Sequence, residues 1–174
     1  MSVIIVNRQR TKKINTRLLR QIVNELLAEL KTPKAILGIN LVGTREMTLV
    51  NETFLQHEGS TDVITFDYAK SVRQASSLSH SKAKYGDRRD ACPMLHGEVF
   101  ICVDEAISQS RKFKTTWQSE IVRYITHGIL HLLGHDDLKS KSRNKMKREE
   151  NRLLRMLSKK FSLAQIGGGS KLHA

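Results

Sequence analysis

The sequence predicts a single α+β domain, in which about five helices pack over a four-stranded mixed sheet. Short runs rich in β-branched residues are interspersed with longer stretches that have apolar residues at helical spacing. These strands and helices do not follow the strict alternation that builds a parallel α/β sheet. The 174 residues are enough for one domain with a substantial core, and we expect it to span residues 1–160. The Gly-rich end, residues 161–174, is predicted to be a flexible tail.

Four segments have the composition and alternation of strands: 3–6, 37–42, 61–68 and 97–103. In the fourth segment Val99 and Ile101 would point to one face of the sheet. Phe100 and Cys102 would point to the other face, so this strand is predicted to be central and covered on both sides.

Five segments have the apolar periodicity of helices: 17–30, 45–56, 105–113, 117–133 and 138–160. Thr16, Thr44 and Asp104 immediately precede the first three and are suitable N-cap residues. The polar stretch 69–93 separates the third and fourth strands. It is predicted to be a long surface loop.

The most informative stretch surrounds a pair of histidines in the helix predicted over 117–133. His127 and His131 are four residues apart, so they share one face of that helix. Gly134 should end the helix, and the turn after it carries His135, Asp136 and Asp137. Two imidazoles and one group from the turn can hold a zinc ion while a fourth position stays open for water, as in catalytic sites. The alternative to a metal site is that both histidines are hydrogen-bonded core residues. Histidine pairs at this spacing also arise by chance.

The net charge is +13 and is concentrated at the two ends of the chain. Residues 1–24 contain six basic groups and no acid, and residues 138–160 contain ten basic groups and two acids. The region between them is nearly balanced, with thirteen basic groups and fifteen acids over 25–137. This pattern favours a polyanion such as RNA, held through its phosphates, although solvated helix faces and anionic membrane surfaces suit the same charge.

The two cysteines and the apolar runs bear on the compartment. Cys92 and Cys102 do not form a disulfide framework, so we predict reduced thiols and a cytoplasmic location. No apolar run approaches the roughly 20 residues of a membrane span, so no membrane partner is expected.

The histidine-rich stretch resembles the signature of the YbeY family, which are zinc-dependent endoribonucleases and rRNA maturation factors. That signature reads approximately H-G-x-L-H-L-x-G-[YH]-D-H, and residues 127–136 match it throughout. Residues 51–54 and 61–66 resemble the family's LN…TDVLSF block. Residues 97–101 resemble its GDIVI strand. The resemblance implies the same α+β architecture, and it implies that His127, His131 and Asp137 hold one zinc ion and form the catalytic centre.

Two positions depart from the family pattern. The third metal-binding histidine of the family falls at Asp137, and aspartate is an acceptable zinc ligand. His135 is the competing third ligand. Many relatives carry an arginine where this chain has Leu55, and nearby His57 is a possible substitute that would face the phosphate.

The resemblance implies a single-strand-specific, metal-dependent endoribonuclease that matures the 3′ end of 16S rRNA and takes part in ribosome quality control. Its partners would be rRNA and the ribosome or its small subunit, with basic residues of 139–160 following the RNA backbone. Asp62 would either hydrogen-bond a ligand imidazole or serve in a turn. Asp136 would either orient a ligand, take a proton or simply solubilise the helix end.

Two other functions stay open. The first is a non-catalytic ribosome-assembly or RNA-binding factor with a structural zinc site. The second is a metallopeptidase, because the histidine spacing matches the H-E-x-x-H helix of zinc proteases. Gly128 occupies the position of the catalytic glutamate in that motif, which counts against the peptidase.

Overall fold

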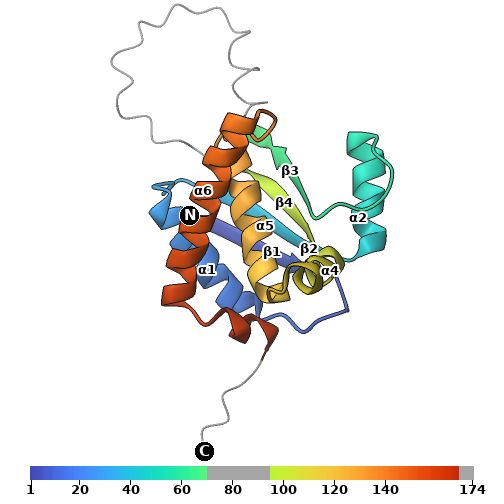
Figure 1. The fold of residues 1–174 in the computed structure, drawn as a ribbon, viewed down its shortest axis with the longest axis horizontal. Coiled ribbons are helices and arrows are strands. Elements are labelled where there is room, and N and C mark those ends of the chain that lie inside the picture. The colour runs from blue at the N-terminus through green and yellow to red at the C-terminus, as the bar shows by residue number, and fades with distance from the viewer. Residues whose placement is uncertain (70–94, 169–174) are drawn as a thin grey trace, which may run out of the picture.

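The computed structural model describes residues 1–69 and 95–168, which form one domain built on a four-stranded sheet (Figure 1). The strands are β1 (Ser2–Asn7), β2 (Ile36–Val42), β3 (Val63–Asp67) and β4 (His96–Cys102). Their order across the sheet is β1-β2-β4-β3. The first three in that order run parallel, and β3 is antiparallel to β4. The predicted α+β class and mixed sheet are confirmed, as is the central position of β4.

The helices of the described part are α1 (Thr16–Glu29), α2 (Thr44–Val50), α4 (Val103–Phe113), α5 (Trp117–Leu132) and α6 (Ser140–Lys160). A short π-helix, Asn51–Leu55, extends α2, and together they account for the helix predicted over 45–56. The five predicted helices are therefore present. In the part of the chain described here, no helix is both long enough and apolar enough to cross a bilayer.

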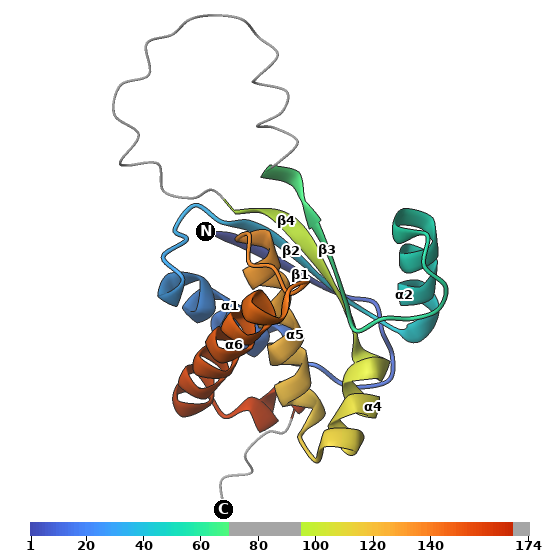
Figure 2. The same ribbon diagram turned by 45° about the horizontal axis from the view of Figure 1, so that its top comes forward.

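Helices cover both faces of the sheet, and each face has its own apolar cluster (Figure 2). The larger core lies beneath α1, α5 and α6 and includes Val99 and Ile101 of β4. A smaller cluster joins α2 to the opposite face through Met47, Cys102 and partly buried Phe100. The two-sided burial predicted for this strand follows directly from its alternating apolar side chains.

Helix α5 packs closely against the sheet at Gly128. A Cβ atom built on Gly128 would lie 2.7 Å from Cγ1 of Val99 and 3.1 Å from Cγ2 of Thr65. The missing side chain therefore allows the helix to pack directly on β3 and β4. Gly128 therefore faces the sheet.

The three predicted helix caps were wrong, and Thr44 is the first residue of α2, whose N-cap position is Gly43. Asn15, not Thr16, caps α1, since its side-chain oxygen accepts from the backbone N–H of Leu18 at 3.0 Å. Asp104 lies inside α4 and does not cap it. Its carboxylate instead accepts from the backbone N–H of Thr44 at 2.8 Å, at the start of α2. A helix start needs an acceptor near its free N–H groups, and here a residue far along the chain supplies it.

The chain continues to pack on the domain beyond residue 160, where the sequence predicts a flexible tail. Leu163–Gly167 form a short 3₁₀ helix, and Ile166 is buried in the main core. The carbonyl of Ile166 accepts a hydrogen bond from the N–H of Asn15 at 2.8 Å. Residues 169–174 lie outside the described residues. So do Cys92 and the predicted loop 69–93, except for Ala69.

Candidate metal centre

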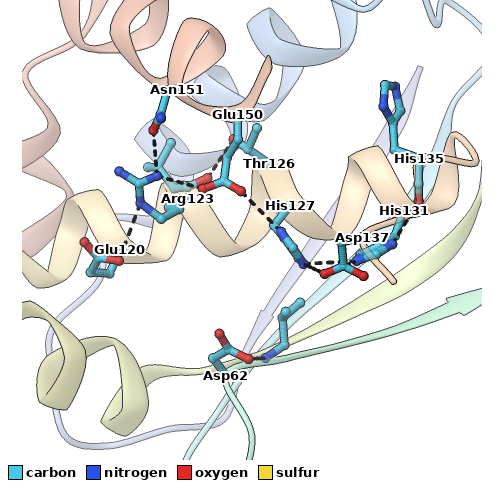
Figure 3. Close-up of polar contacts among 12 residues, drawn as sticks. Asp62, Glu120, Arg123, Thr126, His127, His131, His135, Asp137, Glu150 and Asn151 are labelled. Atoms are coloured by element: carbon cyan, nitrogen blue, oxygen red, sulfur yellow. Dashed lines mark hydrogen bonds and ion pairs between the residues drawn. The ribbon is translucent and has the colours of Figure 1, made fainter. Parts of the chain in front are cut away.

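The end of α5 shapes the turn that carries the third metal-binding candidate. Gly134 has a φ of +89°, and its N–H donates to the carbonyl of His131 at 2.9 Å. The N–H of His135 donates to the carbonyl of Leu130 at 3.0 Å. This pair of bonds is a Schellman motif, which reverses the chain after the helix. The predicted role of Gly134 is confirmed, and the reversal brings Asp137 back over the histidines (Figure 3).

His127, His131 and Asp137 converge on one point. The Nε2 atoms of the two histidines are 3.0 Å apart. Oδ2 of Asp137 lies 3.9 Å from Nε2 of His127 and 3.8 Å from Nε2 of His131. With Zn–ligand bonds of about 2.0–2.1 Å, a tetrahedral ion would separate its ligand atoms by roughly 3.3 Å. The three observed distances bracket that value, so this group can hold a metal ion.

The hydrogen bonds of the two imidazoles also fit a cation between them. Nδ1 of His127 lies 3.2 Å from Oε2 of Glu150, and Nδ1 of His131 lies 3.0 Å from the carbonyl oxygen of His135. Both partners are acceptors, so each Nδ1 carries a proton, and the two Nε2 atoms are left facing each other. At 3.0 Å a proton on one Nε2 can join the two atoms by a hydrogen bond, and with both Nε2 atoms deprotonated their lone pairs can bind one cation. The donor set therefore fits a divalent metal ion.

The site remains partly open to solvent. The side chains of His127 and His131 are 26% and 28% exposed, and that of Asp137 is 37% exposed. A structural zinc site is closed by four protein ligands, whereas a catalytic site keeps a position for water or substrate. Three convergent side chains with this exposure have the form of an open site.

Glu150 on α6 is the functional residue that the sequence analysis missed. It is buried and bound from both sides, by His127 and by NH1 of Arg123 at 2.7 Å. The sequence contains a signal that could have identified Glu150. Glu150 follows Met146 by four residues and precedes Leu153 by three, so it occupies a core-facing position of an otherwise basic helix. A carboxylate among buried apolar side chains needs a partner from another element.

The interaction between His127 and Glu150 favours the charged form of both side chains. Burial acts to lower the pKa of His127, but the hydrogen bond and negative charge of Glu150 outweigh burial and raise it. The charges of Asp137 and Asp62 act in the same direction. Burial acts to raise the pKa of Glu150, and the hydrogen bonds from His127 and Arg123 more than reverse this, so its pKa is lowered. Glu150 therefore stays ionised and supports a positive charge on the imidazole side.

The side chains of His135 and Asp136 do not belong to the group of three that could hold a metal ion. The side chain of His135 points away from the other two histidines, and only its backbone carbonyl serves the site by holding His131 (Figure 3). Asp136 is exposed and its Oδ1 accepts from the N–H of Leu138 at 2.9 Å, as in an Asx-turn. Of the two candidates for the third ligand, the geometry brings Asp137 to the histidines.

The remaining predicted residues lie around the same region. Oδ1 of Asp62 accepts from the N–H of Val63 at 2.9 Å and from Oγ1 of Thr61 at 3.1 Å, so Asp62 has the turn role. Glu150, not Asp62, accepts the hydrogen bond from the imidazole of His127. Leu55 lines a cavity beside the two histidines. His57 is exposed and does not belong to the described lining of that cavity.

Fold and site together define an α+β protein with an open, three-residue centre that can hold a metal ion. Residues 4–158 match the family model described as "Endoribonuclease YbeY". The chain belongs to this family, whose members are RNA-cleaving hydrolases. The resemblance found in the sequence is confirmed.

Individual relatives agree with this assignment. A protein named Endoribonuclease YbeY from Chlorobium phaeovibrioides is 30% identical over 115 residues, which is 66% of this chain and 64% of that protein. One of the same name from Salinibacter ruber is 26% identical over 144 residues, 83% of this chain and 84% of the relative. A third, from Phocaeicola vulgatus, is 35% identical over 109 residues, 63% of this chain and 64% of that protein. The alignments to the first and third therefore span just under two thirds of those relatives.

A solved structure has a similar fold. The solution structure of TM1509 from Thermotoga maritima superposes with a TM-score of 0.59 and covers 99% of both chains. The two sequences are 19% identical, so this comparison supports the arrangement of helices and strands alone.

Proposed function

We propose that this chain is a zinc-dependent, single-strand-specific endoribonuclease that acts on ribosomal RNA in the cytoplasm, and that His127, His131 and Asp137 are its metal ligands. The observation that carries the proposal is the convergence of these three side chains on one point in a member of an endoribonuclease family. The finer assignments, 16S rRNA 3′-end maturation and ribosome quality control, follow from the resemblance of the signature at 127–136. The small ribosomal subunit would be the partner.

The chain's own groups would prepare the centre for this reaction. Glu150 and the carbonyl of His135 each accept an Nδ1 proton and so keep both Nε2 atoms available. Arg143 donates from Nε to the carbonyl of Asp137 at 3.0 Å and steadies the turn that presents this carboxylate. When bound, a zinc ion supplies the Lewis acidity that activates water and stabilises negative charge on phosphate oxygens.

Charge and packing support RNA over a peptide as substrate. The base expected of an H-E-x-x-H peptidase would occupy position 128, where even a Cβ atom would lie 2.7 Å from Val99. That position faces the sheet, away from any substrate. The basic residues of α6 would follow the phosphates of RNA, with an affinity that falls as salt concentration rises.

The test compares metal-loaded wild-type protein with His131→Ala, using a single-stranded and a duplex RNA of the same sequence. We expect wild type to cut the single strand internally, chelation to abolish cutting, and the variant to lose at least about 100-fold in rate, as loss of a metal ligand implies. Equal cleavage by both proteins would remove this site from the reaction. A protein that binds RNA and zinc but never cleaves would favour the RNA-binding factor instead.

A further inference from the structure

A cavity of about 530 Å³ lies between α4, α5 and α6 and opens beside the candidate metal centre. His127 and Asp137 line it next to the centre, and α4 and α6 flank α5 on its two sides (Figure 1). Its volume lies within the roughly 300–1,000 Å³ range of small-ligand sites. A second cavity, lined by Leu55 and His131, lies on the β3 side of the centre. The two cavities meet at His127 and Asp62, which line both.

The basic side chains are divided unequally between the two cavities. Among the described residues, the lining of the β3-side cavity contains no lysine or arginine, and three aspartates contribute to it. The cavity between the helices is lined by Arg123, Arg143 and Lys147, together with the carboxylates Asp62, Glu120, Asp137 and Glu150. Two of these carboxylates, Glu120 and Glu150, pair with Arg123. A phosphodiester that reaches the centre can therefore find a cationic partner on the helix side.

Two of these three cations are suited to a ligand. Arg123 already pairs with Glu150 at 2.7 Å and donates to Asn151 at 3.0 Å. Arg143 uses Nε for the carbonyl of Asp137, which places its guanidinium beside the centre, and the planar fork carries four further N–H donors. Lys147 follows one helical turn later on α6 and lines the same cavity.

An exposed aromatic ring lies on the wall of the same cavity. Phe113, the last residue of α4, is 62% exposed and belongs to the cavity lining. Phe113 shares this lining with Arg143 and Lys147, and Nζ of Lys112 lies 5.5 Å from the centre of its ring. An exposed aromatic ring and cations that line one cavity suit single-stranded nucleic acid, with a base stacked on the ring and the phosphate on the positive charges.

We infer that the cavity between α4, α5 and α6 is the subsite for one nucleotide of a single-stranded RNA, with the phosphate on Arg143 and Lys147 and the base on Phe113. The inference rests on the proposed function and adds to it the side of the centre on which the substrate's charge is neutralised. It also places these cations on the opposite side of the centre from Leu55, which lines the β3-side cavity.

The experiment separates phosphate binding from base binding. Metal-free protein, prepared with chelator, is titrated by NMR with adenosine 5′-monophosphate and with ribose 5-phosphate. We expect Arg143→Ala to weaken both ligands about tenfold, as loss of charged hydrogen bonds predicts. Phe113→Ala should weaken adenosine monophosphate about fivefold or more while sparing ribose phosphate, and Phe113→Tyr should restore its binding.

Arg111→Ala is the matched control, because Arg111 is an exposed arginine of α4 that does not line this cavity, and it should change neither titration. Arg143→Lys keeps the charge without the fork and should be intermediate for both ligands. The inference is overturned if wild type binds neither ligand, if Arg143→Ala matches Arg111→Ala, or if Phe113→Ala weakens both ligands equally. RNA cleavage by wild type is measured in parallel. If wild type cleaves RNA but the variants bind both ligands as wild type does, the proposed function stands and the subsite is rejected. If the variants show the expected loss of binding but wild type does not cleave RNA, the subsite stands and the proposed function is rejected.

Discussion

Glu150 on α6 and His127 on α5 are joined by a hydrogen bond of 3.2 Å between Oε2 and Nδ1. The bond links the basic helix to the helix that carries both histidines, and it determines which nitrogen of His127 faces the centre (Figure 3). Arg123 holds the same carboxylate from the other side. We therefore expect a substitution of Glu150 to change the zinc affinity of the candidate centre.

Glu150→Gln should weaken zinc binding by about 10- to 100-fold, because a neutral amide is a poorer acceptor for the Nδ1 proton and orients the imidazole less well. Competition with a chromophoric chelator would measure this change. Glu149→Gln is the matched control, since Glu149 pairs with Arg152 away from the centre. Equal zinc affinity in the two variants would show that Glu150 does not tune the ligand.

The identity of the third ligand can be tested at two neighbouring carboxylates. Asp137→Asn should weaken zinc binding at least about tenfold, because it removes the charge of a direct ligand. Asp136→Asn should have little effect, since Asp136 is an exposed turn residue. Asp137→His, which introduces the residue that the family signature carries there, should retain binding. If Asp136→Asn proved the more damaging change, the turn would adopt another arrangement around the ion.

Gly128→Ala should destabilise the fold by about 1–3 kcal/mol, the usual range for overpacking a well-filled core. The added methyl would meet Cγ1 of Val99 at 2.7 Å, in a contact between a helix and two strands. Urea unfolding would measure the loss. Val99→Ala removes the opposing methyl groups, so in a double-mutant cycle the two changes together should cost less than the sum of the single changes. A strictly additive result would mean that the helix shifts to make room.

Asp104 should contribute to stability in a pH-dependent way. Burial acts to raise its pKa, but hydrogen bonds from Thr44 and Thr11 outweigh burial and lower it. A carboxyl group whose pKa is lower in the folded state stabilises the protein above its unfolded pKa of about 3.9, and this contribution is lost as pH falls through the folded value.

Asp104→Ala should therefore cost about 0.5–2 kcal/mol near neutral pH, the usual effect of losing a helix cap. The difference from wild type should shrink as the pH falls below about 4. Chemical denaturation at several pH values would follow it, with exposed Glu58→Ala as the control. A gap that stays constant down to the lowest pH would contradict the role of the ionised carboxylate.

Local patterns in the sequence were enough to predict most of the architecture and the two histidines that face the candidate centre. The spacing of His127 and His131 places both on one helix face, and Gly134 ends that helix because it tolerates a positive φ. The central position of β4 follows from apolar side chains that alternate to both of its faces. Each of these inferences depends on residues within a few positions of one another, where the backbone geometry of a helix or strand alone determines which side chains lie on the same face.

Tertiary structure decided the remaining choices. Glu150 reaches His127 across 23 positions, and Asp104 reaches Thr44 across 60, because packing brings separate helices together. The path of the turn after Gly134 brings the side chain of Asp137 to the centre and directs that of His135 away from it. Hydrogen-bond partners and ligand choice depend on distances between elements, and those distances exist only once the hydrophobic faces have been buried against one another.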